Sequence, residues 1–314
     1  MSYSSSTSSY SDDTDTPSIS RSAQRNSLVY KRLSTLPGKN LKKALTDIKD
    51  GKLGTPNTTA HFKEDIRDRS NPANTHVVML DKEHCSFDGV FWIDSEQQLE
   101  RTFSIIRKEH VISFDLEGVE MGKQGEVALV QVALMNGTVF LFDVLTLGQR
   151  VFAAGLKDIL ESNTFLKVVH DCRRDSEILY HRHQVSLNHV FDLQVAHALL
   201  QKKREGNVPI RRYGLQELTH MYIPKHASQR AVDIKYQVRD IFKEGNTEVW
   251  RQRPLSKLMI DYSALDVIVL HPIYNSIAPH LQSPFDKRYL RKHFSEQLTY
   301  FKDSIKPLYS RNLI

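Results

Sequence analysis

The stretch Val111–Val119 (VISFDLEGV) places two carboxylates in the middle of an apolar run. Its β-branched and aromatic residues predict a buried strand. Because successive side chains of a strand alternate between its two faces, Asp115 and Glu117 project from the same face. Two buried carboxylates are costly unless a positive charge compensates them, and a divalent cation bound by oxygen ligands would do so. The stretch therefore predicts a strand that carries one side of a metal site.

The segments that follow this strand predict a mixed sheet. Residues 128–134 and 138–144 have the pattern of two further strands, and Asn136-Gly137 between them is a dipeptide typical of tight hairpins. These three strands would form an antiparallel meander. Strands and helices then alternate up to residue 201, a pattern typical of parallel strands. We therefore expect an α/β fold in which a three-stranded antiparallel meander and additional parallel strands form one sheet flanked by helices.

The second half of the chain has fewer clear patterns. Residues 224–254 are polar and predict no regular element, whereas residues 256–277 predict one long helix with periodic apolar residues. Leu290, Phe294 and Leu298 mark a last helix. We expect this last helix to pack back on the sheet and its helices.

Composition divides the chain into three parts. Residues 1–74 are polar, with a Ser/Thr-rich start, and such a segment cannot bury enough apolar surface to offset its chain entropy. We predict a disordered low-complexity tail and linker at 1–74, one domain at 75–285, and a C-terminal helix at 286–314 that packs on this domain. The tail could recruit a protein partner, although a solubilising role is the simpler interpretation.

The 314 residues carry a formal net charge of +6 and two cysteines. Without a CxxC motif, the two cysteines favour an intracellular, reducing setting in the cytoplasm and/or the nucleus, without a structural zinc site. The first residues contain no apolar run typical of a signal peptide, and no stretch is apolar for long enough to predict a membrane span. The basic charge is compatible with a polyanionic partner such as nucleic acid.

Three later polar residues form a set with Asp115 and Glu117. Asp175 begins a predicted helix just after a strand, and Tyr262 and Asp266 lie one turn apart on the longest predicted helix. Each is weak evidence alone, since an acid in a first helical turn also complements the helix dipole. Together the four carboxylates could hold two divalent cations, an arrangement suited to phosphodiester hydrolysis. The hydroxyl group of Tyr262 could hold the attacking water by a hydrogen bond.

These residues resemble the three motifs of the DEDDy 3′–5′ exonucleases, an RNase H-like family that includes ribonuclease D. The first motif, D-x-E on a strand, matches residues 115–117. The second, a His followed five residues later by an Asp, matches His170 and Asp175, and the third, Y-x-x-x-D on a helix, matches residues 262–266. The stretches DLEGVEMGKQGEVALVQVAL and HDCRRD look like the Egalitarian and exonuclease-domain-containing branch of the family. The resemblance implies an RNase H-like sheet.

The resemblance also implies a function. It points to a two-metal 3′–5′ exonuclease that shortens single-stranded RNA or DNA from its 3′ end, with RNA favoured, and releases nucleoside 5′-monophosphates. Two Mg²⁺ or Mn²⁺ ions per site would be held by Asp115, Glu117, Asp175 and Asp266. Glu117 and Tyr262 would act as catalytic residues that orient the nucleophile.

Two alternatives stay open. Some members of this branch have lost the acids and serve as RNA-binding adaptors, whereas this chain keeps all of them. A catalytically weak or inactive exonuclease fold that binds RNA is therefore the rival interpretation. Asp171 is an alternative metal ligand, although the family spacing from His170 favours Asp175.

Basic residues could bind the nucleic acid. Arg173 and Arg174 lie inside the second motif, where they could bind substrate phosphate or pair with the acids of an inactive site. The segment before the third motif is rich in cations that would either grip phosphates or form a solvated face; they are Lys202, Lys203, Arg204, Arg211, Arg212, Lys225, Arg230, Lys235, Arg239, Lys243, Arg251 and Arg253. Of these we predict nucleic-acid contacts for Arg211, Arg212 and Arg253. Aromatic residues in the same segment could stack on bases or anchor loops: Tyr213, Tyr222, Tyr236 and Trp250.

Overall fold

The structure is a computed structural model that describes residues 78–80, 83–207 and 211–302. The tail and linker predicted at 1–74 lie outside these residues, as does the end of the segment at 286–314. The division of the chain into three parts therefore stays a prediction. None of the helices in the described part combines the length and the apolar composition that a membrane crossing requires.

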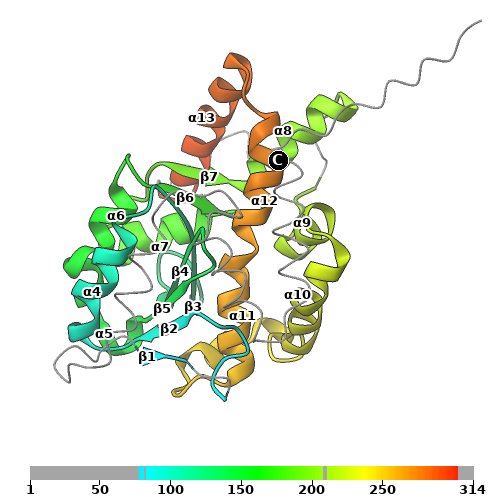
Figure 1. Cartoon of the computed structure of the whole chain (residues 1–314). Coiled ribbons are helices and arrows are strands. Elements are labelled where there is room, and N and C mark those ends of the chain that lie inside the picture. Colours follow the sequence, from blue (N-terminus) through cyan, green and yellow to red (C-terminus); the bar gives the residue numbers. More distant parts are fainter. Residues whose placement is uncertain (1–77, 81–82, 208–210, 303–314) are drawn as a thin grey trace, which may run out of the picture.

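A mixed seven-stranded sheet runs through the described part of the chain (Figure 1). Its strands are β1 (Val78–Met79), β2 (Val90–Ile93), β3 (Val111–Val119), β4 (Glu126–Leu134), β5 (Val139–Asp143), β6 (Leu166–Val169) and β7 (Val190–Asp192). Their order in the sheet is β1-β2-β5-β4-β3-β6-β7. Strands β3, β4 and β5 pair antiparallel in succession, and β6 and β7 extend the sheet in parallel from β3. The predicted mixed sheet is confirmed.

Helices cover both faces of this sheet (Figure 1). One face is packed by α4 (Glu96–Ile106), α5 (Val144–Leu147), the π-helical turn η2 (Phe152–Leu156), α6 (Lys157–Glu161) and α7 (Arg173–His183). The other face is packed by α8 (Leu193–Glu205), α9 (Leu215–Tyr222), α10 (Lys225–Val238), α11 (Lys257–Ile268) and α12 (Leu270–Ile277). Short 3₁₀ turns are η3 (Lys243–Gly245), η4 (Glu248–Arg251) and η5 (Ala278–His280), and the last helix, α13 (Pro284–Thr299), contacts α7, α8 and β7.

The alternation predicted for β3 separates its two faces as expected. Phe114 and Leu116 are buried in the apolar cluster beneath α4 to α7. Asp115 and Glu117 project to the opposite face, where α11 contacts β3. One strand therefore contributes apolar residues to the core on one face of the sheet and places two acids on the other face.

The prediction of no regular element at 224–254 is wrong, because this region contains α10. The apolar stripe of α10 is narrow, with Ala231, Ile234 and Val238 buried against the core. Polar residues fill the remaining positions, so the sequence shows only a weak helical pattern. Packing of this stripe against α9 and α11 stabilises the helix.

The single helix predicted at 256–277 is observed as two helices, α11 and α12, which join at Val269. Pro272 explains the break, because proline has no backbone N–H to donate to the carbonyl of Ile268 four residues earlier. The third motif lies wholly on α11, before this break.

A β-bulge lies beside Glu117. Glu117 faces Leu129 across the β3–β4 pair, but Gly118 faces Val127, so one residue of β4 is left over. A Cβ atom on Gly118 would lie 2.0 Å from the carbonyl oxygen of Glu126. The close approach of the two strands therefore requires glycine at this position, and the bulge fixes where Glu117 projects.

We predict that Gly118→Ala lowers the free energy of unfolding by about 1–3 kcal/mol, since β4 must shift to accept the methyl group. Urea denaturation would measure the loss. Gly214→Ala is the matched control, because a Cβ atom there would lie at an ordinary van der Waals distance of 3.8 Å from its nearest neighbour, Oε2 of Glu217. Equal stability of the two variants would contradict the role assigned to Gly118.

Candidate metal centre

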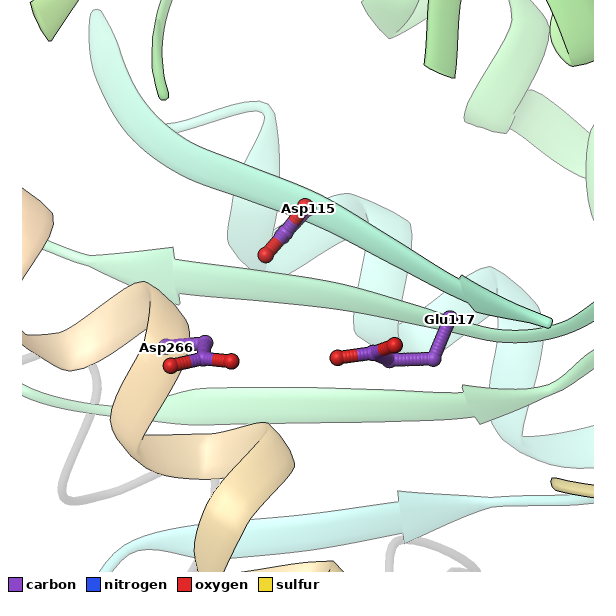
Figure 2. A group of neighbouring side chains, drawn as sticks. All are labelled: Asp115, Glu117 and Asp266. Carbon is purple, nitrogen blue, oxygen red and sulfur yellow. The ribbon is translucent and has the colours of Figure 1, made fainter. Parts of the chain in front are cut away.

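Three carboxylates from two elements meet on the α11 side of the sheet. Asp115 and Glu117 come from β3 and Asp266 from α11, and Figure 2 shows the three side chains turned toward one another. One oxygen of each carboxylate lies within 4.8 Å of the others. Asp266 is 3% exposed, whereas the two residues on β3 keep partial access to solvent. The structure thus brings together three of the four predicted metal ligands.

Burial and repulsion from neighbouring carboxylates raise the pKa values of Asp115 and Glu117. Burial raises the pKa of Asp115 to about 7, and the negative charge of Asp266 adds to this shift. The backbone N–H of Leu116 opposes it by donating a hydrogen bond of 2.9 Å to Asp115. Burial, followed by the charge of Asp115, raises the pKa of Glu117 well above its ordinary value. The protein alone therefore compensates the negative charge of the site incompletely.

Asp175, the fourth predicted ligand, lies in the first turn of α7. Burial and then the charge of Asp115 raise the pKa of Asp175 well above its ordinary value, so the two acids influence each other without Asp175 joining the three-acid group. Asp171, the alternative ligand, instead forms ion pairs with Arg173 at 2.5 Å and with Arg212 at 3.3 Å. This arrangement favours Asp175 over Asp171.

Tyr262 lies one turn before Asp266 on α11. Burial, followed by the charges of Asp266 and Glu117, raises the pKa of the Tyr262 phenol well above its ordinary value, so the hydroxyl group keeps its proton. The ring packs near those of Phe242 and Trp250, with centroid distances of 5.5 and 6.1 Å. These contacts hold the hydroxyl group on the side of the acids.

Lys235 of α10 also belongs to the site, although the sequence singles it out only as one of many cations. Its side chain is 17% exposed, and its Nζ atom forms an ion pair with Asp266 and lies 4.1 Å from the ring centroid of Tyr262. Helical spacing is the signal that could have found it. Lys235 follows the buried Ala231 by four residues and precedes the buried Val238 by three, and a lysine on such a stripe requires a partner.

The two arginines of the second motif are paired with acids other than the predicted ligands. Arg173 donates hydrogen bonds of 2.5 and 2.7 Å to Asp171, and Arg174 pairs with Glu177 at 2.7 Å. The segment Tyr300-Phe301 after α13 lies against both arginines. The ring centroid of Tyr300 lies 5.0 Å from the Cζ atom of Arg173, and that of Phe301 lies 4.1 Å from the Cζ atom of Arg174. Sequence reasoning did not anticipate this aromatic cover.

The other three arginines predicted to contact nucleic acid are paired as well. Arg253 makes hydrogen bonds of 2.9 and 2.6 Å to Asp143, whose side chain is 3% exposed. Arg212 forms an ion pair with Asp171, and Arg211 forms an exposed ion pair with Glu217 of α9. A role in nucleic-acid binding stays a prediction for all three.

The four predicted stacking residues differ in their contacts. The hydroxyl group of Tyr213 accepts a hydrogen bond of 3.2 Å from Nε2 of Gln201. Trp250 is 1% exposed, and Tyr222 shares a hydrogen bond of 2.7 Å with His197, so both anchor the fold. Tyr236 is 64% exposed, and the Cζ atom of Arg239 lies 4.6 Å from its ring centroid. Stacking of Tyr236 on a base stays a prediction.

The donor set fits a divalent cation. All the candidate ligands are carboxylates, which Mg²⁺ and Mn²⁺ prefer. The Oδ1 atom of Asp266 is buried, and among the described residues its polar contact is the ion pair with Lys235. A cation placed among these acids would relieve the repulsion between them and release the protons that Asp115 and Glu117 retain through their raised pKa values.

Replacing Asp115 should stabilise the metal-free protein. An unfolded aspartate loses its proton near pH 4, whereas folded Asp115 holds it until about pH 7. The folded state binds more protons within this window, so stability falls as the pH rises from about 4 to about 7. At about pH 8 without metal, we expect Asp115→Asn to raise the free energy of unfolding by roughly 1–2 kcal/mol, after allowance for partial solvent screening.

Urea denaturation at about pH 4 and pH 8 would measure this difference, which should vanish at the lower pH. Asp158→Asn is the control, since Asp158 is an exposed acid on α6 across the sheet, and surface changes alter stability by about 0.5 kcal/mol or less. A loss of stability in Asp115→Asn at the higher pH would contradict the repulsion.

Arg253→Ala should lower the free energy of unfolding by about 2–4 kcal/mol, because the substitution leaves Asp143 buried without its cation. Arg211→Ala breaks an exposed pair and should cost about 1 kcal/mol or less. Thermal or urea unfolding of both variants would measure the contrast. Similar small losses in both would show that the Arg253 pair contributes little to the fold.

Comparison with known proteins identifies the family of the chain. A family model described as 3′–5′ exonuclease matches residues 90–282. The human piRNA biogenesis protein EXD1 is 36% identical over 182 residues, which cover 57% of this chain and 34% of that protein. The Egalitarian protein homolog of Caenorhabditis elegans is 27% identical over 199 residues, which cover 61% of this chain and 33% of that protein. The chain thus spans about a third of the length of these curated relatives.

Solved structures show the same fold. The crystal structure of Trypanosoma brucei RNase D with GMP matches with a TM-score of 0.59 and 25% identity, covering 72% of this chain and 68% of that one. The complex of Trypanosoma brucei RNase D with RNA U12 matches with a TM-score of 0.57 and 24% identity, covering 72% and 74%. The family match, the three motifs and the fold agree, and the chain belongs to the 3′–5′ exonuclease family, in its DEDDy type.

Proposed function

We propose that this protein is a metal-dependent 3′–5′ exonuclease that hydrolyses single-stranded nucleic acid, RNA in preference to DNA, and releases nucleoside 5′-monophosphates. The observation that carries the proposal is the meeting of Asp115, Glu117 and Asp266 within 4.8 Å, with Tyr262 one turn before Asp266 on α11 and Asp175 near enough for its charge to interact with that of Asp115. The acids and the phenol match the set that the family uses for this reaction.

Each residue has a distinct role in this proposal. Asp115, Glu117 and Asp266 would hold one Mg²⁺ or Mn²⁺ ion, and Asp115 with Asp175 would hold a second. When bound, the two ions would lower the pKa of a water molecule and stabilise the leaving oxygen. Glu117 would accept a hydrogen bond from that water, and the protonated hydroxyl group of Tyr262 would orient it toward the phosphorus.

The preference for RNA rests on the relatives. The solved complex of Trypanosoma brucei RNase D contains RNA, and the EXD1 relatives are described as piRNA biogenesis proteins. A 3′ end of single-stranded RNA is therefore the substrate we propose for this chain. An intracellular location, in the cytoplasm and/or the nucleus, and a protein partner for residues 1–74 stay predictions.

Asp115→Ala and Asp266→Ala should each reduce cleavage at least about 100-fold, because each removes a ligand that the transition state needs. The assay uses 5′-labelled single-stranded RNA and a DNA of the same sequence, with Mg²⁺, Mn²⁺ or EDTA, resolved on a gel. A ladder that shortens from the 3′ end, and disappears with EDTA, is the expected result. Asp158→Ala controls for removal of an acid elsewhere and should keep full activity; undiminished cleavage by Asp115→Ala would remove the proposal.

A second candidate is a non-catalytic RNA-binding adaptor. The ion pair between Lys235 and Asp266 favours it, because the chain itself then supplies part of the positive charge that the acids require. Intact RNA in both metals, together with a mobility shift of the same RNA, would identify the adaptor.

A further inference from the structure

We propose that Lys235 is a built-in counter-cation of the metal centre, and that a divalent cation must displace its ammonium group from Asp266 in order to bind. The inference rests on the proposed function only in taking the three acids as a divalent-cation site. It assigns to Lys235 control over how tightly that site binds its metal.

The position of Lys235 on α10 is the first observation. The helix packs against α9 and α11 through Ser228, Ala231, Ile234 and Val238, all of which are buried. Lys235 lies along the edge of this stripe, and its side chain is 17% exposed. The lysine therefore points between α10 and α11 and not into solvent.

The contacts of the ammonium group are the second observation. The Nζ atom pairs with Oδ1 of Asp266 and lies 4.1 Å from the ring centroid of Tyr262. Within the described part of the chain no other group forms a hydrogen bond with that oxygen, so its charge faces the lysine. The negative charges of Asp115 and Glu117 are also partly offset by Lys235. One ammonium group thus acts on all three acids of the site.

An ammonium group and a divalent cation cannot share these acids at no cost. A charged lysine has three donors and no acceptor, so it cannot ligate a metal. A Mg²⁺ ion bound to a carboxylate oxygen lies about 2.0–2.1 Å from it, and an ammonium group on the same carboxylate would face that ion as a like charge at close range. Metal binding therefore requires Lys235 to leave Asp266, which weakens the apparent affinity of the site.

The test is isothermal titration calorimetry of the full chain with MnCl₂ as the only ligand. We expect Lys235→Met, which keeps the length and apolar stem of the side chain, to bind Mn²⁺ at least about ten-fold more tightly than the wild type. Lys235→Arg keeps a cation and should bind as weakly as the wild type. Lys225→Met removes an exposed lysine from the start of the same helix, well over 10 Å away along its axis, and should leave the affinity unchanged within two-fold.

A thermal-shift titration with the same ion provides a second readout, in which Lys235→Met should gain more stability from Mn²⁺ than the wild type does. Lys235→Gln serves as a second neutral variant if Lys235→Met does not fold. Affinity that is equal or lower in the neutral variant than in the wild type would overturn the inference, while RNA cleavage by the wild type would leave the proposed function intact. No Mn²⁺ binding by either protein would overturn both.

Discussion

The fold holds three carboxylates close together, and the repulsion between them has to be offset by the rest of the structure. At an effective dielectric constant of about 20, two unit charges separated by 4.8 Å or less repel each other by about 3 kcal/mol or more. This exceeds what an exposed ion pair contributes, which is about 1 kcal/mol or less. The apolar clusters on both faces of the sheet hold β3 and α11 together against that repulsion. The remaining negative charge has to be compensated by a cation, which comes from the chain or from solution.

The sequence correctly predicted the elements for which the residue types and their spacing indicate the same structure. The two-residue alternation of β3 correctly separated Asp115 from Phe114, and the Asn136-Gly137 dipeptide correctly predicted the hairpin between β4 and β5. The four-residue spacing of the third motif correctly placed Tyr262 and Asp266 on one face of a helix. These features are local, so they require no knowledge of which distant segments meet.

The features that the sequence could not reveal depend on contacts between distant segments. Helical spacing indicates that Lys235 needs a partner, but nothing near it in the chain identifies Asp266 as that partner, because the contact forms only when α10 packs on α11. The arginine-rich segment posed the same difficulty. Its sequence contains many cations, yet Arg211, Arg251 and Arg253 all form ion pairs with acids in the fold. Much of the positive charge of this segment is therefore neutralised within the molecule.

The aromatic cover over the second motif has a consequence for how the protein is prepared. Tyr300-Phe301 lies just beyond the last helical turn of α13, where a shortened version of the domain would naturally be cut. Such a cut would leave the sheet and every acid in place while removing the rings that lie against the guanidinium groups of Arg173 and Arg174. A trimmed domain would then lack these cation–ring contacts, and a property measured on this surface of the fragment would not describe the same surface of the intact chain.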